Sequence, residues 1–268
     1  MAASAALGIA LVVLIAAMTV AWGVRMRTGN SGWIDACWSI ATAAAGVLLA
    51  LGAATPHSQP ARMLLAALLV GGWGLRLGGH IALRAARGGD DPRYADLARQ
   101  WGDRLPQRLY GFLMIQALCG FGLALAVFAG AHAPRTAPDL RDLIAAAILA
   151  VAIVGEGIAD AQLRRFAADP ANRGKVCDRG LWRWSRHPNY FFEWLGWLAW
   201  PVMAIDLSGA WPWGWAALVA PVLIYVLLVH ASGIPPLEAH MLRSRGEAFR
   251  TYQARTSAFF PWPPRREA

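Results

Sequence analysis

The sequence predicts an all-α membrane protein, a bundle of about seven transmembrane helices. Three observations predict this fold class. Hydrophobic residues make up 57% of the chain and charged residues only 15%, whereas soluble domains usually carry about 25% charged residues. Apolar runs of about 20 residues, the length that crosses a bilayer, recur along the chain. The basic residues gather in alternate connections between these runs, as in the positive-inside pattern of membrane proteins.

Seven apolar runs are long enough to be considered as spans. They cover about 3–24, 32–53, 62–83, 109–130, 140–161, 190–206 and 212–232. The sixth run is the shortest and is rich in tryptophan. No basic residue precedes the first run, which is also longer than the apolar part of a usual signal peptide. We therefore expect the first run to be a membrane span.

The distribution of charge orients the predicted bundle. The net charge is +9, and most basic residues follow the first, third, fifth and seventh runs. The other connections carry only Arg62 in one, and Arg135 and Arg141 in another. This pattern predicts an outside N-terminus, a cytoplasmic C-terminus and an odd number of spans. We expect residues 1–268 to form one integral domain of a bacterial inner membrane.

The same charge bears on partners. In a soluble protein a basic balance would suggest nucleic acid, but here topology and anionic membrane lipid account for it. No nucleic acid and no obligate protein partner are indicated. Cys37, Cys119 and Cys177 lack the spacing of metal ligands, so neither a metal site nor a disulfide framework is expected.

Ionisable residues inside apolar runs are candidates for function because they are costly there. Asp35 lies near the start of the second run, either as a helix-start carboxylate favoured by the dipole or as a protonated carboxyl in an apolar cavity. In the third run Trp73, Arg76 and His80 share one helical face. His80 is either a packed, hydrogen-bonded residue or a chemical group of the site. Tyr94 follows in a connection, either in a solvated turn with Asp90 and Asp91 or closing over a site.

The end of the fifth run carries an acidic ladder. Glu156, Asp160 and Arg164 are four residues apart and share one helical face. They form either a salt-bridge ladder or the wall of a polar cavity. The depth of Glu156 in the run favours the cavity.

The densest signal is a cationic and aromatic segment at 172–194. Arginine and lysine suit phosphates, and tryptophan or tyrosine suits a stacked flat ring. Pro188 is compatible with a helix start, which would place Asn189 and Glu193 on one face. We expect a nucleotide-type cofactor here, a belt for lipid headgroups being the alternative. The candidate cofactor residues of this segment are Asn172, Arg173, Lys175, Trp182, Arg186, His187, Asn189, Tyr190 and Glu193.

A further stretch after the last run is amphipathic up to Tyr252 and is expected to lie on the membrane surface. Glu238 and His240 either cap the cofactor cavity or are plain interfacial residues.

These residues carry a resemblance. The run GLWRWSRHPNYFFE at 180–193 resembles the signature of the steroid 5-alpha-reductase family, most closely its bacterial branch. Asp160, Leu163 and Arg164 upstream and the run YQARTSAFFPW at 252–262 are also similar to that family. The resemblance is strong over about 155–262 and thinner before it.

The resemblance implies a membrane reductase of about seven spans that uses NADPH. Such enzymes reduce a carbon–carbon double bond conjugated to a ketone, as in 3-oxo-Δ4-steroids. Residues 1–135 would then form mainly the substrate side and residues 136–268 the cofactor half, on the cytoplasmic face. The positions that match cofactor contacts of the family are Asp160, Arg164, Lys175, Asn189 and Glu193.

The substrate ketone is bound in the family by a glutamate of span two and a tyrosine of span three. This sequence departs from that pair, because it offers Asp35 and Trp73, with His80 about two turns further on. We expect Asp35, Trp73 and His80 to form the catalytic group. A hydrogen-bond or proton donor at the ketone oxygen would stabilise the charge that hydride addition creates there.

Two alternatives remain. The segment around Arg186 and His187 also resembles isoprenylcysteine carboxyl and phospholipid methyltransferases, which use S-adenosylmethionine. Their glutamate pair after the last span is here only Glu238, and the acidic ladder with Asn189 and Glu193 favours the reductase. A lipid or solute carrier is the third reading, but the sequence shows no inverted repeats.

Overall fold

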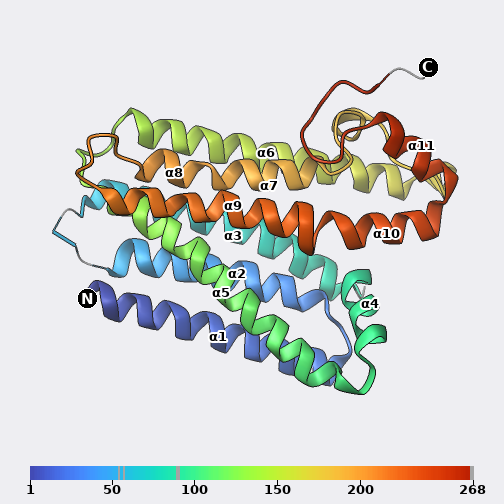
Figure 1. The fold of residues 1–268 in the computed structure, drawn as a ribbon, viewed down its shortest axis with the longest axis horizontal. Coiled ribbons are helices and arrows are strands. Elements are labelled where there is room, and N and C mark those ends of the chain that lie inside the picture. Colours follow the sequence, from blue (N-terminus) through green and yellow to red (C-terminus); the bar gives the residue numbers. More distant parts are fainter. Residues whose placement is uncertain (54, 57, 89–90, 266–268) are drawn as a thin grey trace. The chain divides into compact units, whose positions relative to one another are not determined.

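A computed structural model describes residues 1–53, 55–56, 58–88 and 91–265 (Figure 1). These residues form helices and turns, and no β-strand occurs among them, which confirms the all-α prediction. Six helical stretches of this part of the chain are long and apolar enough to cross a membrane, compatible with a multi-pass integral membrane protein. They are Ala3–Thr28, Gly32–Gly52, Pro60–Ala86, Arg93–Ala131, Leu140–Ala168 and Pro212–Arg245. The count of seven spans and the orientation of the termini stay predictions.

The sixth apolar run, expected at 190–206, is the one missing from that set. It forms two helices, α7 (Pro188–Trp197) and α8 (Ala199–Ala204), interrupted at Leu198. Pro201 explains the interruption, because proline has no N–H to donate to the carbonyl of Trp197 four residues earlier. The seventh run is also irregular. It contains η4 (Pro212–Leu218), α9 (Val219–Tyr225) and the π-helix η5 (Val226–Ala231), and α10 (Ile234–Arg245) follows it.

The chain divides into two compact units. The first comprises Met1–Ala146 and Leu198–Ala220, and the second Ala147–Trp197 and Pro221–Ala268. The boundary expected between residues 135 and 136 stays a prediction.

In the first unit, α2 (Gly32–Gly52) contacts α1 (Ala3–Thr28), α3 (Pro60–Ala86) and α5 (Leu105–Ala131). Small residues let α2 and α3 approach closely, as in many membrane bundles. A Cβ added at Gly74 of α3 would lie only 2.1 Å from the Cβ of Ala43 on α2. Glycine is therefore required at this crossing.

A short helix, α4 (Pro92–Trp101), precedes α5 where the sequence reading placed only a connection. The Asp91 side chain accepts a hydrogen bond from the Arg93 N–H, and proline occupies the first turn, a favourable helix start. Tyr94, Leu97 and Trp101 pack against the core of the first unit. The α4 helix thus brings a tyrosine and an arginine to the start of α2. Asp90 lies outside the described residues.

At the opposite end of α3, Arg62 forms a buried ion pair with Asp142 in the first turn of α6 (Leu140–Ala168). Both side chains are fully buried, and the guanidinium donates to the two carboxylate oxygens at 2.8 and 3.0 Å. The carbonyls of Ala133, Arg135 and Thr136 accept its other hydrogen bonds. This end of the unit therefore carries a cation that is fully compensated inside the protein.

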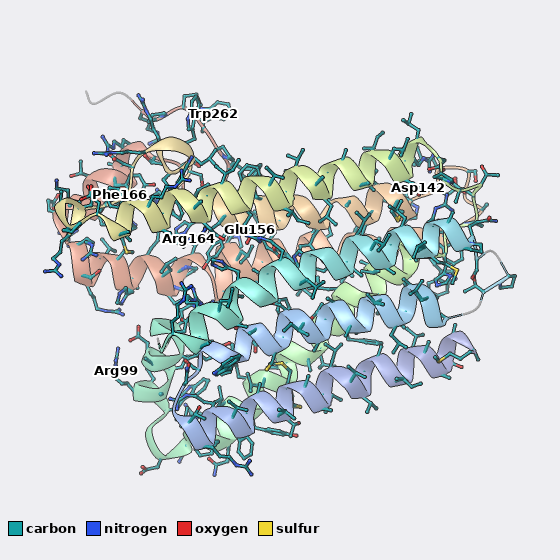
Figure 2. All side chains as sticks on the ribbon, turned by 180° about the vertical axis from the view of Figure 1, so that it is seen from behind. Arg99, Asp142, Glu156, Arg164, Phe166 and Trp262 are labelled. Atoms are coloured by element: carbon teal, nitrogen blue, oxygen red, sulfur yellow. The ribbon has the colours of Figure 1, made fainter. Side chains whose placement is uncertain are left out.

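The second unit contains the later part of α6, α7, α10 and α11 (Glu247–Arg255). The helices α6 and α7 pack closely at Gly155. A Cβ added there would lie only 2.4 Å from the Phe192 ring. The helices α10 and α11 contact each other and are joined by Gly246, which has a φ of +54°. Figure 2 shows Glu156 and Arg164 along α6.

Candidate functional site

The first candidate site is built at the start of α2. The Gly32 N–H donates to the Oδ1 of Asn30 at 2.8 Å, which supports the helix start. Asp35 follows in the first turn, where the positive end of the helix dipole favours a carboxylate. The helix start therefore fixes the position of this acid.

Both oxygens of Asp35 accept hydrogen bonds from α4. The Tyr94 hydroxyl donates to Oδ1 at 2.8 Å, and Nη2 of Arg93 donates to Oδ2 at 2.5 Å. Asp91 in turn holds Arg93, accepting from its Nε at 3.0 Å and its Nη2 at 2.9 Å. Burial opposes ionisation of Asp91, but the hydrogen bonds and charge of Arg93 outweigh it and lower the pKa of Asp91. In this arrangement the phenol of Tyr94 is the O–H group beside the carboxylate.

Tyr94 is buried, with 6% of its surface exposed. Its oxygen accepts a hydrogen bond from Nε2 of Gln116 on α5 at 3.1 Å. The Oε1 of Gln116 is buried and has no hydrogen-bond partner within the described part of the chain. The hydrogen-bonded chain from Asp35 through Tyr94 therefore ends at Oε1 of Gln116. A ligand could donate a hydrogen bond to this oxygen.

The other two predicted catalytic residues lie on α3. Trp73 is buried and His80 is half-buried. The aromatic hydroxyl beside Asp35 comes from Tyr94 of α4. Catalytic roles for Trp73 and His80 stay predictions.

The second candidate site lies in the second unit, where α6 and α7 carry the acidic and amide groups. Glu156 is buried, Asp160 is half-buried and Arg164 is exposed. Nδ2 of Asn189 on α7 donates to the Oδ1 of Asp160 at 3.4 Å. Two residues predicted to bind the cofactor are thus brought together from different helices. Glu193 of α7 is also buried, and its Oε1 accepts from the indole N–H of Trp197 at 2.9 Å.

The connection between these helices is folded onto α6. The Asn172 amide donates to the carbonyl of Phe166 at 3.0 Å. The Trp182 indole is buried and donates to the carbonyl of Ala159 at 2.9 Å. Arg173 and Lys175 have exposed side chains. The cations of this connection therefore face solvent, while its tryptophan anchors it.

Glu238 of α10 organises the segment that precedes α7. Arg186 donates to both carboxylate oxygens, at 2.7 and 3.2 Å, and Nε2 of His187 lies 2.9 Å from Oε1. Gln253 of α11 donates to Oε2 at 2.7 Å. Arg186 also donates to the carbonyls of Gln253 at 3.2 Å and Thr256 at 2.5 Å. The structure thus joins three predicted cofactor residues, Arg186, His187 and Glu238, in one network. His240 lies on α10 and is half-buried.

His187 leaves one polar atom of this network available. Burial lowers the pKa of His187, although the hydrogen bond and charge of Glu238 oppose the shift. The neutral ring therefore donates through Nε2 and stacks on Tyr190, with the rings 5.5 Å apart and 11° from parallel. Nδ1 is buried without a hydrogen-bond partner among the described residues. A ligand that carries both hydroxyls and phosphates would suit this buried acceptor and the exposed cations of the same unit.

Comparison with known protein families bears on both sites. Residues 21–256 match the family model described as "Protein of unknown function (DUF1295)". The chain belongs to the DUF1295 family. No curated protein and no solved structure matches it. The matched part of this DUF1295 protein includes both the Asp35 group and the Glu238 network.

Some site residues of this DUF1295 chain were missed by sequence reasoning. The sequence pattern gives Tyr94 only the alternatives of a solvated turn or a cover over a site, and it assigns no role to Gln116 or Gln253. The spacing of Tyr94, Leu97 and Trp101 after an Asp-Pro pair would have predicted the amphipathic helix α4. No sequence signal marks the main-chain carbonyls that hold Arg186.

Proposed function

We propose that this protein reduces the carbon–carbon double bond of a lipophilic enone, such as a 3-oxo-Δ4-steroid, with NADPH. The observation that carries the proposal is the hydrogen bond of 2.8 Å from Tyr94 to Asp35. It places a tyrosine beside the carboxyl of the second span, a pair similar to the glutamate and tyrosine that bind the ketone in steroid 5-alpha-reductases, although this tyrosine comes from α4 and not from span three. The relationship of the DUF1295 family to steroid 5-alpha-reductase-like membrane proteins supports the same reaction.

The chain's own residues act on the ketone oxygen. NADPH, when bound, supplies the hydride for the β-carbon of the enone. Negative charge then develops on the ketone oxygen, and the Tyr94 hydroxyl turns from Asp35 to donate a hydrogen bond there. Arg93 stays paired with the Asp35 carboxylate. The α-carbon takes its proton from water, which completes the reduction.

The residues that would hold NADPH lie in the second unit. The exposed Arg173 and Lys175 suit its phosphates. Asp160 and Glu193 offer carboxylate acceptors for ribose hydroxyls or the carboxamide. The buried Nδ1 of His187 would accept one further hydrogen bond.

Ligand-dependent thermal unfolding of the detergent-purified protein tests the cofactor. NADPH is expected to raise the midpoint by several degrees when added well above its dissociation constant. Stabilisation by S-adenosylmethionine and not by NADPH would instead support the methyltransferase alternative. NADH serves as the comparison for cofactor preference.

A matched pair of variants then locates the cofactor. Glu193→Gln should weaken the NADPH-induced shift, because Glu193 is a buried acceptor on α7. Glu247→Gln is the control, since that side chain is 79% exposed and pairs only at the surface with Arg250. Equal NADPH affinity in both variants would place the site elsewhere.

A further inference from the structure

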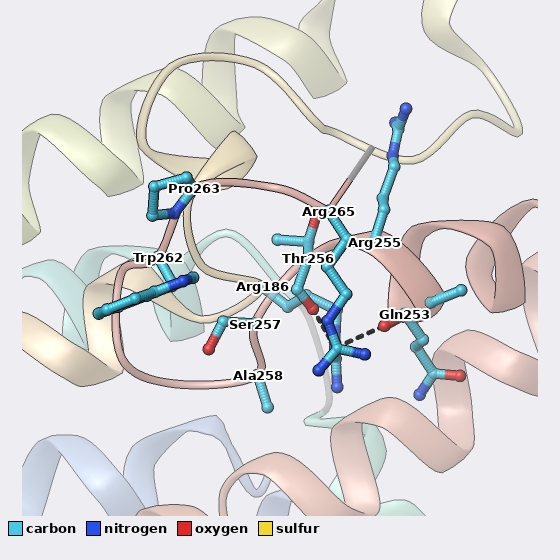
Figure 3. A pocket seen from close by; sticks show the side chains of 10 residues that line it. Arg186, Gln253, Arg255, Thr256, Ser257, Ala258, Trp262, Pro263 and Arg265 are labelled. Atoms are coloured by element: carbon cyan, nitrogen blue, oxygen red, sulfur yellow. Dashed lines mark hydrogen bonds between the residues drawn. The ribbon is translucent and has the colours of Figure 1, made fainter. Parts of the chain in front are cut away.

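A pocket of about 370 Å³ lies in the second unit between α11 and the segment that follows it (Figure 3). Three arginines line it, Arg186, Arg255 and Arg265, together with Trp262. No aspartate or glutamate is among its described lining residues. Glu238 pairs with Arg186 and Asp178 with Arg255, so three cations meet two carboxylates. The pocket therefore keeps a net positive charge.

Main-chain hydrogen bonds fix the walls of the pocket. The Arg186 N–H donates to the carbonyl of Ser257 at 2.8 Å, and the Trp262 N–H to that of Trp184 at 2.9 Å. The Arg265 N–H donates to the carbonyl of Arg255, also at 2.9 Å. The segment after α11 is thus folded back on the connection before α7. A ligand would meet arginines whose backbones are already in place, which lowers the cost of binding.

Two exposed aromatic rings lie on the same segment. Phe260 is 46% exposed and Trp262 is 70% exposed. The helix α10 ends the membrane-spanning candidate Pro212–Arg245, and α11 follows directly. The segment is therefore expected near the headgroup layer, where exposed aromatic and basic residues are favoured.

We propose that this pocket binds the phosphate group of an anionic phospholipid. Guanidinium groups match phosphate oxygens with paired hydrogen bonds. A free phosphate would use the same arginines, but it would have no use for Phe260 and Trp262, whereas a lipid would cover these rings with its glycerol and acyl parts. The assignment rests on the pocket alone and does not depend on the reductase proposal.

Native mass spectrometry of the full chain, released from detergent with added phosphatidylglycerol, tests the proposal. The wild type should retain the lipid. Arg265→Gln should lower the bound fraction at limiting lipid by about fivefold in affinity, and adding Arg255→Gln should lower it by a similar factor again. Arg250→Gln is the matched control, because Arg250 is an exposed arginine of α11 that pairs with Glu247 and does not line the pocket.

The controls separate binding from folding. If the Arg255→Gln variant unfolds because Asp178 loses its ion pair with Arg255, the lipid retention of Arg265→Gln alone tests the proposal. Equal lipid retention in Arg265→Gln and the Arg250→Gln control would overturn the proposal. Thermal stabilisation by inorganic phosphate without lipid retention would overturn the lipid assignment in favour of a free phosphate. NADPH-induced stabilisation, measured on the same variants, reports separately on the proposed function.

Discussion

The Tyr94 hydroxyl donates a hydrogen bond of 2.8 Å to the carboxylate of Asp35, a residue 59 positions earlier in the chain. Asp35 lies in the first turn of α2, which is long and apolar enough to cross a membrane, whereas Tyr94 belongs to the short helix α4. The pair depends on Arg93, which binds the second oxygen of Asp35. The Tyr94 O–H group is thereby held beside a carboxylate whose charge Arg93 compensates.

Tyr94→Phe removes the hydroxyl and keeps the ring. We expect the rate constant kcat for NADPH-dependent enone reduction to fall about 10²–10³-fold, the cost of losing one donor at a developing oxyanion. Thermal stabilisation by NADPH should be unchanged. Tyr110→Phe on α5 is the control, because that side chain is 38% exposed. Wild-type kcat in Tyr94→Phe would exclude Tyr94 as the donor.

Asp35→Asn keeps the size of the side chain but removes its charge. The Arg93 guanidinium then loses one of its carboxylates, and the phenol loses its strongest acceptor. We expect kcat to fall at least about tenfold because the phenol is no longer oriented. Asp96→Asn on α4 is the control, as Asp96 pairs with Arg99. Full activity of Asp35→Asn in a steady-state assay of a 3-oxo-Δ4-steroid would remove Asp35 from the mechanism.

His187 makes stability depend on pH. Its pKa in the folded protein lies below the ordinary value of 6.5 because the ring is buried. The unfolded chain therefore binds a proton first as the pH falls, and stability present above pH 6.5 is lost as the pH drops through the folded pKa. The melting temperature of the wild type should exceed that of His187→Gln by more at about pH 7.5 than at about pH 5.5. A constant difference, or the same trend in the control His240→Gln, would contradict this origin.

Gly74 tests the packing of α2 against α3. Gly74→Ala places a methyl group against Ala43, so we expect a loss of about 1–3 kcal/mol in the free energy of unfolding. Gly79→Ala on the same helix has nothing within 4 Å of the added Cβ, and should be neutral or stabilising by up to about 1 kcal/mol. Denaturation in detergent measures both, and equal stabilities would refute the close crossing.

The buried pair of Arg62 and Asp142 predicts that a single variant loses more stability than the double variant. Arg62→Met leaves Asp142 buried without its cation, so we expect a loss of about 3–5 kcal/mol. Adding Asp142→Leu should restore part of this loss, because no uncompensated charge remains. Thermal unfolding of the two variants checks the order. A double variant less stable than Arg62→Met would argue against the pair.

Hydropathy and residue type predicted most of the fold. The first five spans correspond to α1, α2, α3, α5 and α6 because long apolar runs have one favourable structure in a bilayer. The run at 190–206 failed as a single helix through Pro201, whose effect on the hydrogen bond to Trp197 competes with hydropathy. The composition of the run alone does not show whether its hydropathy or the missing N–H of Pro201 determines the structure.

The candidate sites were predicted less evenly. Asp35 stands out as an acid in an apolar run, and Asp160 and Asn189 stand out by spacing. The structure places Asp35 beside Tyr94 and Asp160 beside Asn189, and their roles stay predictions. Tyr94 is easily missed because its partner lies far away in sequence and α4 is a short amphipathic helix that is polar on average. The carbonyls that bind Arg186 are backbone atoms, which carry no residue identity.

The buried pair at the end of α3 also constrains how the protein is made. Arg62 leaves the ribosome 80 residues before Asp142, and the carbonyls that share its guanidinium come from residues 133–136. Arg62 therefore lacks every one of these partners until residues 133–142 have been synthesised. The buried environment of the third helix is therefore complete only once the first turn of α6 has been synthesised.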